Sequence, residues 1–227
     1  MSENKEYFFK PWPYSSHSLL LDEFENQGNN ECVLDVGCGT GYLGAKLQQR
    51  GYLVIGVEKY PLDIGFYQYY ADIIQSDIEK WEGPNNGVTF DYILMADILE
   101  HVCDPEAVVR RLTSYLKPTG TIIICVPNVA HLYVRMKLLV GCWDYQDYGI
   151  MDRTHLRFFT KKSLQDLVIN VGIDRFKVKP VVLPWPLIIQ NNHELFQKTM
   201  IRCDSLATKI WPTMFAYQWI VSGRMRI

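Results

Sequence analysis

The feature that most constrains this chain is a short apolar run that ends in a cluster of glycines. Residues 32–37 read Cys-Val-Leu-Asp-Val-Gly, and Gly39, Gly41 and Gly44 follow closely. Such an apolar run is typical of a parallel strand buried on both faces. Glycines after it allow positive φ values and close approach of a ligand, and the amino end of the next helix attracts an anionic group. The sequence therefore predicts a strand, a ligand-binding turn and a helix.

The rhythm of the remaining chain predicts the fold class. After the first strand, further strands are expected over residues 53–57, 72–75, 90–95, 121–126, 176–183 and 215–222. Helices are expected over residues 15–24, 42–50, 63–69, 105–116, 130–140 and 163–170, with a serine and Asp104 as two of the caps. This alternation predicts an α/β fold with a doubly wound parallel sheet that helices cover on both faces.

Two segments interrupt this rhythm within what we expect to be a single domain over residues 1–227. Residues 128–160 include a stretch dense in aromatic residues, glycine and charge, which predicts a lid or acceptor-site insertion. Residues 184–212 are expected to form an addition to the domain before the last strand.

Charge argues against a nucleic-acid partner. The chain has 23 basic and 25 acidic side chains, a net charge of −2, so it lacks the positive field that DNA binding requires. The charge is unevenly distributed, because residues 1–150 sum to −9 and residues 151–227 to +7. Either the folded molecule mixes the two surfaces, or the basic part faces an anionic substrate or surface.

The cysteines and the apolar runs predict a cytoplasmic protein. The six cysteines have no metal-ligand spacing and are expected to be reduced. The first ten residues are too polar for a signal peptide, and the longest apolar run, residues 181–189, is shorter than the roughly 18 residues that cross a bilayer.

The glycine spacing distinguishes two kinds of cofactor. A dinucleotide fingerprint that starts at Gly37 requires a glycine where Tyr42 stands. An Asp two residues before G-x-G-x-G instead resembles the first motif of the class I S-adenosylmethionine-dependent methyltransferases. The resemblance implies their Rossmann-like fold, a mostly parallel seven-stranded sheet whose last strand is antiparallel, and S-adenosylmethionine as the cofactor.

The same resemblance assigns the first group of cofactor contacts. In the family the glycine turn holds the methionine and ribose portion of the cofactor, and the acid before it contacts the amino group. Carried over to this chain, the contacts are Asp35, Gly37, Cys38, Gly39 and Gly41.

Two acidic positions extend the resemblance. Glu58 ends an apolar strand 21 residues after Gly37, and its two oxygens can accept both ribose hydroxyls, with Lys59 beside it. Asp77 matches the acid that reaches the adenine amino group in the family, and Ile78 would pack on the adenine ring. A surface acid that ends a strand or caps a turn is the alternative at both positions.

A further segment completes the family pattern. Residues 90–102 enter as a strand and end in Leu-Glu-His-Val, which is similar to methyltransferases related to ubiquinone biosynthesis. There, such a run lies beside the transferable methyl group, so Met95 and Ala96 would contact the cofactor through their backbones. Residues 149–160 look like a stretch of bacterial methyltransferases associated with cell-surface glycan and lipid assembly, so a small-molecule, glycan or lipid-linked acceptor is expected.

The expected chemistry is methyl transfer, most readily to oxygen. Displacement at a sulfonium depends on alignment and exclusion of water and requires no metal. A base assists a hydroxyl acceptor, and histidine suits that role near neutral pH. His155 and His101 are the candidates. If the segment around His155 is extended, Arg153, His155 and Arg157 share a face and the two arginines can bind an acidic substrate group. Thr154, Leu156 and Phe158 then share the other face, which packs on the domain. A solvated charged face is the alternative.

Two rival functions remain open. A non-catalytic module could bind S-adenosylmethionine without turnover, and a nicotinamide-dependent oxidoreductase could use the same fold, although Tyr42 argues against it.

The C-terminal segment mixes aromatic and basic residues and could grip an amphiphilic substrate or make peripheral contact with a membrane. Packing of the aromatic residues in the core is the alternative. The residues concerned are Trp185, Trp211, Phe215, Tyr217, Trp219, Lys198, Arg202, Lys209, Arg224 and Arg226.

Overall fold

The protein folds around one mixed sheet. The computed structural model describes residues 9–61, 68–84, 87–188 and 194–226, in which seven strands are ordered β3-β2-β1-β4-β5-β7-β6. The strands are β1 (Cys32–Val36), β2 (Leu53–Glu58), β3 (Asp72–Gln75), β4 (Phe90–Ala96), β5 (Leu116–Pro127), β6 (Ile173–Val181) and β7 (Gln218–Met225). β7 pairs antiparallel with both β5 and β6, and the other pairs are parallel. The expected α/β fold with an antiparallel last strand is confirmed.

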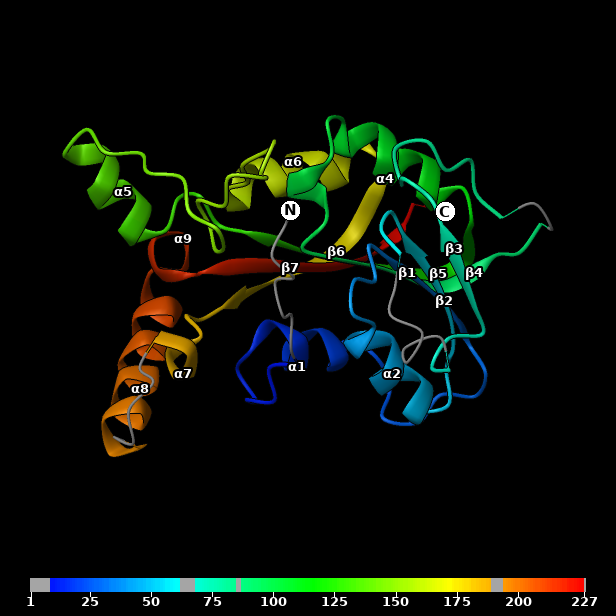
Figure 1. Cartoon of the computed structure of the whole chain (residues 1–227), viewed down its shortest axis with the longest axis horizontal. Helices are drawn as coiled ribbons and strands as arrows, with labels where there is room; N and C mark the ends of the chain where they lie inside the picture. Colours follow the sequence, from blue (N-terminus) through cyan, green and yellow to red (C-terminus); the bar gives the residue numbers. More distant parts are fainter. Residues whose placement is uncertain (1–8, 62–67, 85–86, 189–193, 227) are drawn as a thin grey trace.

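Helices cover both faces of the sheet. Figure 1 shows α4 and α6 on one face and α1 and α2 on the other. The helices are α1 (Ser16–Leu21), α2 (Tyr42–Gln49), the 3-10 helix η1 (Leu99–His101), α4 (Pro105–Thr113), α5 (Leu132–Leu139), α6 (Lys161–Asn170), α7 (Trp185–Ile188), α8 (Glu194–Ile210) and α9 (Pro212–Phe215). The helix expected over 63–69 lies largely outside the described residues.

Alternating side chains of the central strands build two cores. Leu34 and Ile122 belong to the core beneath α4 and α6, whereas Val33 and Ile123 belong to the core beneath α1 and α2. All four are fully buried. Because neighbouring residues of a strand point to opposite faces, an apolar run is required when both faces are covered.

The side chains at the helix starts confirm the expected caps. The Ser15 hydroxyl accepts from the Ser18 backbone N–H at 3.1 Å, and Asp104 Oδ1 accepts from the Ala107 backbone N–H at 3.0 Å. Each cap satisfies a backbone donor that the first helical turn leaves unpaired.

Three expected strand boundaries were wrong. β5 starts at Leu116 instead of residue 121, because Leu116 already pairs with Phe90 of β4. β6 begins at Ile173, opposite Met225 of β7. β7 begins only at Gln218 because Pro212 starts helix α9, for which a proline at the first position is well suited.

The C-terminal aromatic residues divide between the core and the surface. Trp219 is fully buried in the core, Tyr217 and Phe215 are partly buried, and Trp211 is exposed. Arg224 and Arg226 lie at the opposite end of β7 from the helices, so the single aromatic and basic surface expected for this segment is wrong.

Four helices gather at one edge of the sheet. Pro127 at the end of β5 pairs with Gln218 at the start of β7, and Gln218 pairs with Val181 at the end of β6. The carboxyl ends of the parallel strands therefore meet the segments that contain α5, α7, α8 and α9, which Figure 1 shows at one end of the molecule. Among the described residues, no helix is long and apolar enough to cross a membrane.

Candidate active site

Positive φ values shape the turn between β1 and α2. Gly37, Gly39 and Gly41 have φ values of 67°, 52° and 76°, in the left-handed region that side chains disfavour. A Cβ atom at Gly37 would also lie 2.8 Å from Cδ1 of Ile98, directly after β4. The turn thus needs glycine both for its backbone and for its contact with the β4 loop.

Asp35 is held beneath this turn by a tyrosine. The Tyr70 hydroxyl donates to Asp35 Oδ2 at 2.8 Å, and Asp35 is almost fully buried. Burial raises the pKa of Asp35 to about 6 against the opposing hydrogen bond from Tyr70, and the nearby charge of Glu58 raises it further. Tyr70 fits because Gly44 and Gly56 lack side chains, since a Cβ atom at Gly44 would lie 2.2 Å from its hydroxyl.

Glu58 connects the end of β2 to the glycine turn. Its Oε2 accepts from the Gly39 backbone N–H at 2.9 Å, and its Oε1 accepts from the Tyr60 backbone N–H at 3.1 Å. The first two predicted cofactor motifs therefore meet at the same edge of the sheet.

Asp77 is fixed by a cation and a backbone donor. Lys59 Nζ lies 3.0 Å from Asp77 Oδ2, and Asp77 Oδ1 accepts from the Glu79 backbone N–H at 3.1 Å. The hydrogen bond from Lys59 lowers the pKa of Asp77, so its carboxylate is ionised at neutral pH. Ile78 is buried, and Arg111 donates to its carbonyl. The structure thus brings the predicted contacts Lys59 and Asp77 together.

The segment after β4 contains one half-buried acid, Asp97, and one buried acid, Glu100. Met95 is fully buried and Ala96 half-buried at the end of β4. Asp97 follows with a φ of 54°, which is unusual for a residue other than glycine, and its Oδ1 accepts from Gln218 Nε2 at 2.7 Å. Burial raises the pKa of Asp97, and burial together with the charge of Asp97 raises that of Glu100 well above its usual range.

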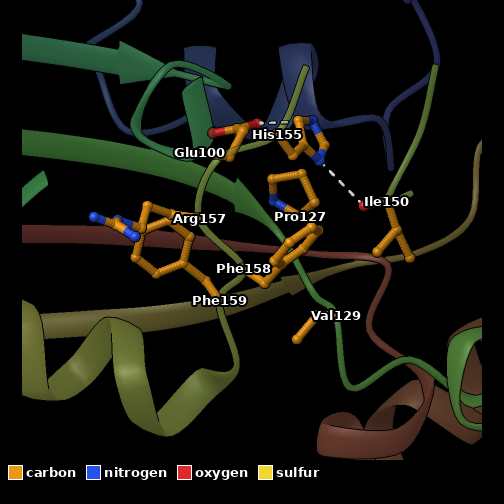
Figure 2. A pocket seen from close by; sticks show the side chains of 8 residues that line it. All are labelled: Glu100, Pro127, Val129, Ile150, His155, Arg157, Phe158 and Phe159. Carbon is orange, nitrogen blue, oxygen red and sulfur yellow. Dashed lines mark hydrogen bonds and ion pairs between the residues drawn. The ribbon is translucent and has the colours of Figure 1, made fainter. Parts of the chain in front are cut away.

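The two predicted catalytic histidines lie side by side, His101 at the end of this segment and His155 in the loop after α5. The ring centroids of His101 and His155 are 4.9 Å apart. His155 Nδ1 lies 3.1 Å from the Ile150 carbonyl oxygen, and its Nε2 lies 4.0 Å from Glu100 Oε1, as Figure 2 shows. His101 Nδ1 lies 3.2 Å from the Thr154 carbonyl oxygen. The loop of residues 140–160 is therefore anchored on the segment that follows β4.

The expected alternation of the loop side chains was wrong. Residues 151–154 turn instead of extending, because the Asp152 backbone N–H donates to the Gly149 carbonyl and its Oδ1 accepts from the Thr154 backbone N–H. His155 is buried, whereas Leu156 and Phe158, which were expected to pack on the domain, are exposed.

The two arginines do not share the environment of His155. Arg153 pairs with Asp147 at 2.6 Å on the surface. Arg157 donates to the Cys103 carbonyl from Nε at 2.9 Å, and Figure 2 shows its guanidinium directed away from His155. A common substrate-facing row of these three residues is therefore wrong, although each arginine remains a predicted substrate contact.

The same cluster has the composition of a cation site. One ligand atom each from Glu100, His101 and His155 lies within 4.8 Å of the others. Carboxylate and imidazole groups suit divalent transition metals. The described residues would permit a metal here, although methyl transfer was expected to require none.

Comparison with known proteins decides the family. A family described as "Methyltransferase domain" matches residues 11–174. The chain belongs to the class I S-adenosylmethionine-dependent methyltransferases. The match contains the glycine turn, the acids after β2 and β3, and the two histidines. The resemblance drawn from the sequence motifs is confirmed.

Individual relatives of this methyltransferase cover parts of its length. The ubiquinone biosynthesis O-methyltransferase of Vibrio campbellii is 35% identical over 42% of this chain and 43% of its own. That of Cereibacter sphaeroides is 27% identical over 68% of this chain and 67% of its own. Phosphoethanolamine N-methyltransferase 2 of Haemonchus contortus, solved with S-adenosyl-L-methionine, gives a TM-score of 0.63 at 15% identity over 93% of this chain and 52% of its own. The last likeness shows the shared fold.

Three residues of the site were missed by the sequence motifs. Tyr70, Asp97 and Gln218 lie far apart in the chain, and only the sheet order brings Gln218 of β7 to Asp97. Gly44 and Gly56 were the one available sign of Tyr70, because small residues often mark the close approach of a large one.

Proposed function

We propose that this methyltransferase transfers a methyl group from S-adenosylmethionine to a hydroxyl of a small-molecule, glycan or lipid-linked acceptor. The observation that supports it best is the position of His155, which is buried between Glu100 and the Ile150 carbonyl at the edge where the cofactor motifs meet. Transfer to oxygen is supported by the relatives named ubiquinone biosynthesis O-methyltransferase.

The cofactor lies, in this proposal, across the carboxyl ends of β1, β2 and β3. Gly37 to Gly41 approach its methionine and ribose portion, and Cys38 contributes backbone to this turn. Glu58 accepts the ribose hydroxyls after giving up its contact with the Gly39 N–H, and Asp77 receives the adenine amino group. Asp35 supports the turn from below and lies near the amino group of the methionine portion.

His155 has the geometry of a proton acceptor. When its Nδ1 donates to the Ile150 carbonyl, the neutral ring carries its lone pair on Nε2. The acceptor oxygen forms a bond to the methyl carbon, the carbon–sulfur bond breaks with its electrons going to sulfur, and the hydroxyl proton passes to Nε2. The Glu100 carboxyl lies 4.0 Å from Nε2. Burial and the charge of Asp97 raise its pKa in the resting site, and the positive imidazolium that forms would favour its ionised form.

Residues 128–160 act as the lid of this site. The hollow shown in Figure 2 between the lid and the end of β5 has no space for a water molecule. The residues around the hollow therefore pack against one another, and a lid excludes water from the transfer only once it has closed over an acceptor. We therefore expect the acceptor to enter by displacement of the lid, whose exposed Leu156 and Phe158 would then close over it.

The test compares two lid variants with the parent once an acceptor has been found. His155→Ala is expected to lower turnover by about 10²–10⁴-fold, the usual contribution of a general base, while S-adenosylmethionine affinity stays within a few fold. Arg157→Ala is expected to raise the acceptor KM. Unchanged turnover in His155→Ala would end its proposed role, and an unchanged acceptor KM in Arg157→Ala would end that of Arg157. Binding of S-adenosylhomocysteine without turnover on any acceptor would favour a non-catalytic module.

Metal removal tests the remaining part of the proposal. We expect turnover to survive dialysis against a chelator, because charge is dispersed in displacement at a sulfonium and no Lewis acid is needed. Loss of turnover that added Mg²⁺ or Zn²⁺ restores would contradict this and would make Glu100, His101 and His155 metal ligands.

A further inference from the structure

Helix α8 presents an apolar row to solvent. Leu195, Leu206 and Ile210 are 81%, 59% and 76% exposed. Their spacing of eleven and then four residues places them on one side of a helix. Phe196 beside them and Trp211 at the end of the helix are also largely exposed. A helix on the surface of a globular protein ordinarily turns such residues inward.

Contacts on the opposite side of α8 hold the helix in this orientation. Asp204 Oδ2 accepts from the Leu183 backbone N–H and from Trp185 Nε1, both at 3.0 Å. Asp204 and Thr208 are buried, one helical turn apart. Rotation of the helix to hide its apolar row would break these contacts, so the row faces outward as part of the fold.

A second row of the same helix is basic. Lys198, Arg202 and Lys209 are exposed beside the apolar row. The helix contains two acids, Glu194 at its first position and Asp204, which lies on the buried side. An apolar row bordered by cations is the pattern of helices that lie in the interface of an anionic bilayer.

We propose that α8 docks this methyltransferase on the surface of an anionic lipid bilayer. A second copy fits less well, because an antiparallel pair of α8 helices would place its basic rows against each other. Helix α5 also exposes apolar residues at this end of the molecule, but its Lys137 is already paired with Asp144 at 2.8 Å. Charge complementarity with anionic lipid therefore favours α8.

The position of α8 relates the docked surface to the active site. α8 leads through α9 into Gln218, whose amide contacts Asp97 beside the catalytic segment. Figure 1 shows α8 at the same end of the molecule as the lid helix α5. Docking would bring the acceptor edge of the sheet close to the bilayer, where a lipid-linked acceptor resides. Membrane binding itself does not depend on the proposed reaction.

Vesicle co-sedimentation of the full chain tests the docking. The parent is expected to sediment with vesicles of phosphatidylcholine and phosphatidylglycerol at low salt, and far less with phosphatidylcholine alone. Leu206→Ser should weaken this partition about tenfold, the effect of one apolar side chain kept in water. Lys209→Gln should weaken it about fivefold, the effect of one cation at an anionic surface.

Matched controls come from α6, on one face of the sheet. Ile169→Ser and Lys162→Gln make the same chemical changes at exposed positions of that helix and should leave partition unchanged. The parent should also show a blue-shifted tryptophan emission on binding, and Trp211→Phe should remove most of the shift.

Three results would overturn the proposal. They are absence of binding to the anionic vesicles at low salt, equal losses in the α6 and α8 variants, and a parent dimer in solution that Leu206→Ser dissociates. The last result would assign the apolar row to a second copy. Because partition is measured without turnover, its failure is distinguishable from failure of the proposed methyl transfer.

Discussion

Tyr70 shows how a single side chain supports the glycine turn from outside the motif. Its hydroxyl bonds to Asp35, and its ring fills the space left by Gly44 and Gly56. A buried carboxyl without such a donor carries the full cost of its lost hydration. The Asp-x-Gly pattern of the sequence therefore works only because a residue from the segment before β3 completes it.

Loss of the Glu58 carboxylate should weaken cofactor binding. We expect Glu58→Ala to reduce S-adenosylmethionine affinity about 10–100-fold, because hydrogen bonds to a charged group contribute about 1.5–3 kcal/mol. Calorimetric titration measures the effect. Glu106→Ala on the exposed surface of α4 is the control and should bind as the parent does. Parent-like binding by a folded Glu58→Ala would place the ribose elsewhere.

A substitution at Gly39 tests whether the cofactor binds against the backbone of the glycine turn. A side chain there meets open space in the fold, since the nearest atom to a Cβ would be the Gly37 carbonyl oxygen at 3.9 Å. Gly39→Val should therefore cost about 1–2 kcal/mol of unfolding free energy through its φ of 52°, and cofactor binding should be abolished because the valine occupies the approach to the turn. Retained binding in this variant would contradict the assignment of the turn.

The shifted pKa of Asp35 predicts a pH dependence of cofactor affinity. Its pKa of about 6 means that the carboxyl is protonated below that pH and loses its attraction for the cofactor amino group. S-adenosylmethionine affinity should therefore fall as the pH is lowered from 7 to 5. Titrations across this range should show a flat profile for Asp35→Asn, and an equally steep profile in that variant would assign the effect to another group.

At the scale of elements, the proposed lid over residues 128–160 depends on the start of α5. His131 Nδ1 accepts from the Tyr133 backbone N–H at 3.1 Å and caps this helix. Burial lowers the pKa of His131 to about 4, so the ring is neutral in the fold and can accept. Protonation would remove the cap.

This cap predicts acid sensitivity. The pKa of His131 is lowered on folding from about 6.5, so the unfolded chain binds a proton between pH 6.5 and 4 that the fold excludes, and stability falls as pH decreases through that window. His131→Asn keeps a capping oxygen without titrating. Its melting temperature should match that of the parent near pH 7.5 and exceed it at pH 5, whereas a constant difference would contradict the role of the cap.

Elements with strong local signals were predictable and those held by distant contacts were not. The strand that begins at Cys32 and the caps at Ser15 and Asp104 were predictable because the residues that form each of them are close together in the sequence. The lid was not, because its turn at 151–154 is stabilised by Asp152 and by bonds from residues 156 and 157 to the Glu100 carbonyl. Within the site, the cofactor motifs were visible in the sequence, but the pairing of His155 with Glu100 required the fold.

At the scale of the whole molecule, the sheet order separates the charges of the chain. The acidic first part supplies β3, β2, β1 and β4, whereas the basic residues from 151 onward supply β6 and β7 at the other edge. Lys179 of β6 pairs with Glu23, so some of this charge is neutralised within the fold. Strands β6 and β7 carry four basic residues and one acid, Asp174, so the β6 edge of the sheet is the more basic one.

Cofactor binding should stabilise the whole domain, because the site joins segments from β1 to the lid. A ligand at 100 times its Kd adds about 2.7 kcal/mol to the unfolding free energy. For a chain of this size, each kcal/mol raises the melting temperature by about 2–4 °C. S-adenosylmethionine or S-adenosylhomocysteine should therefore raise it by about 5–10 °C in a thermal shift measurement, and NAD should not. The shift should disappear in Gly39→Val. A shift with NAD and none with the adenosyl compounds would contradict the cofactor assignment, because Tyr42, which stands where a dinucleotide turn requires its third glycine, would then have to tolerate a pyrophosphate.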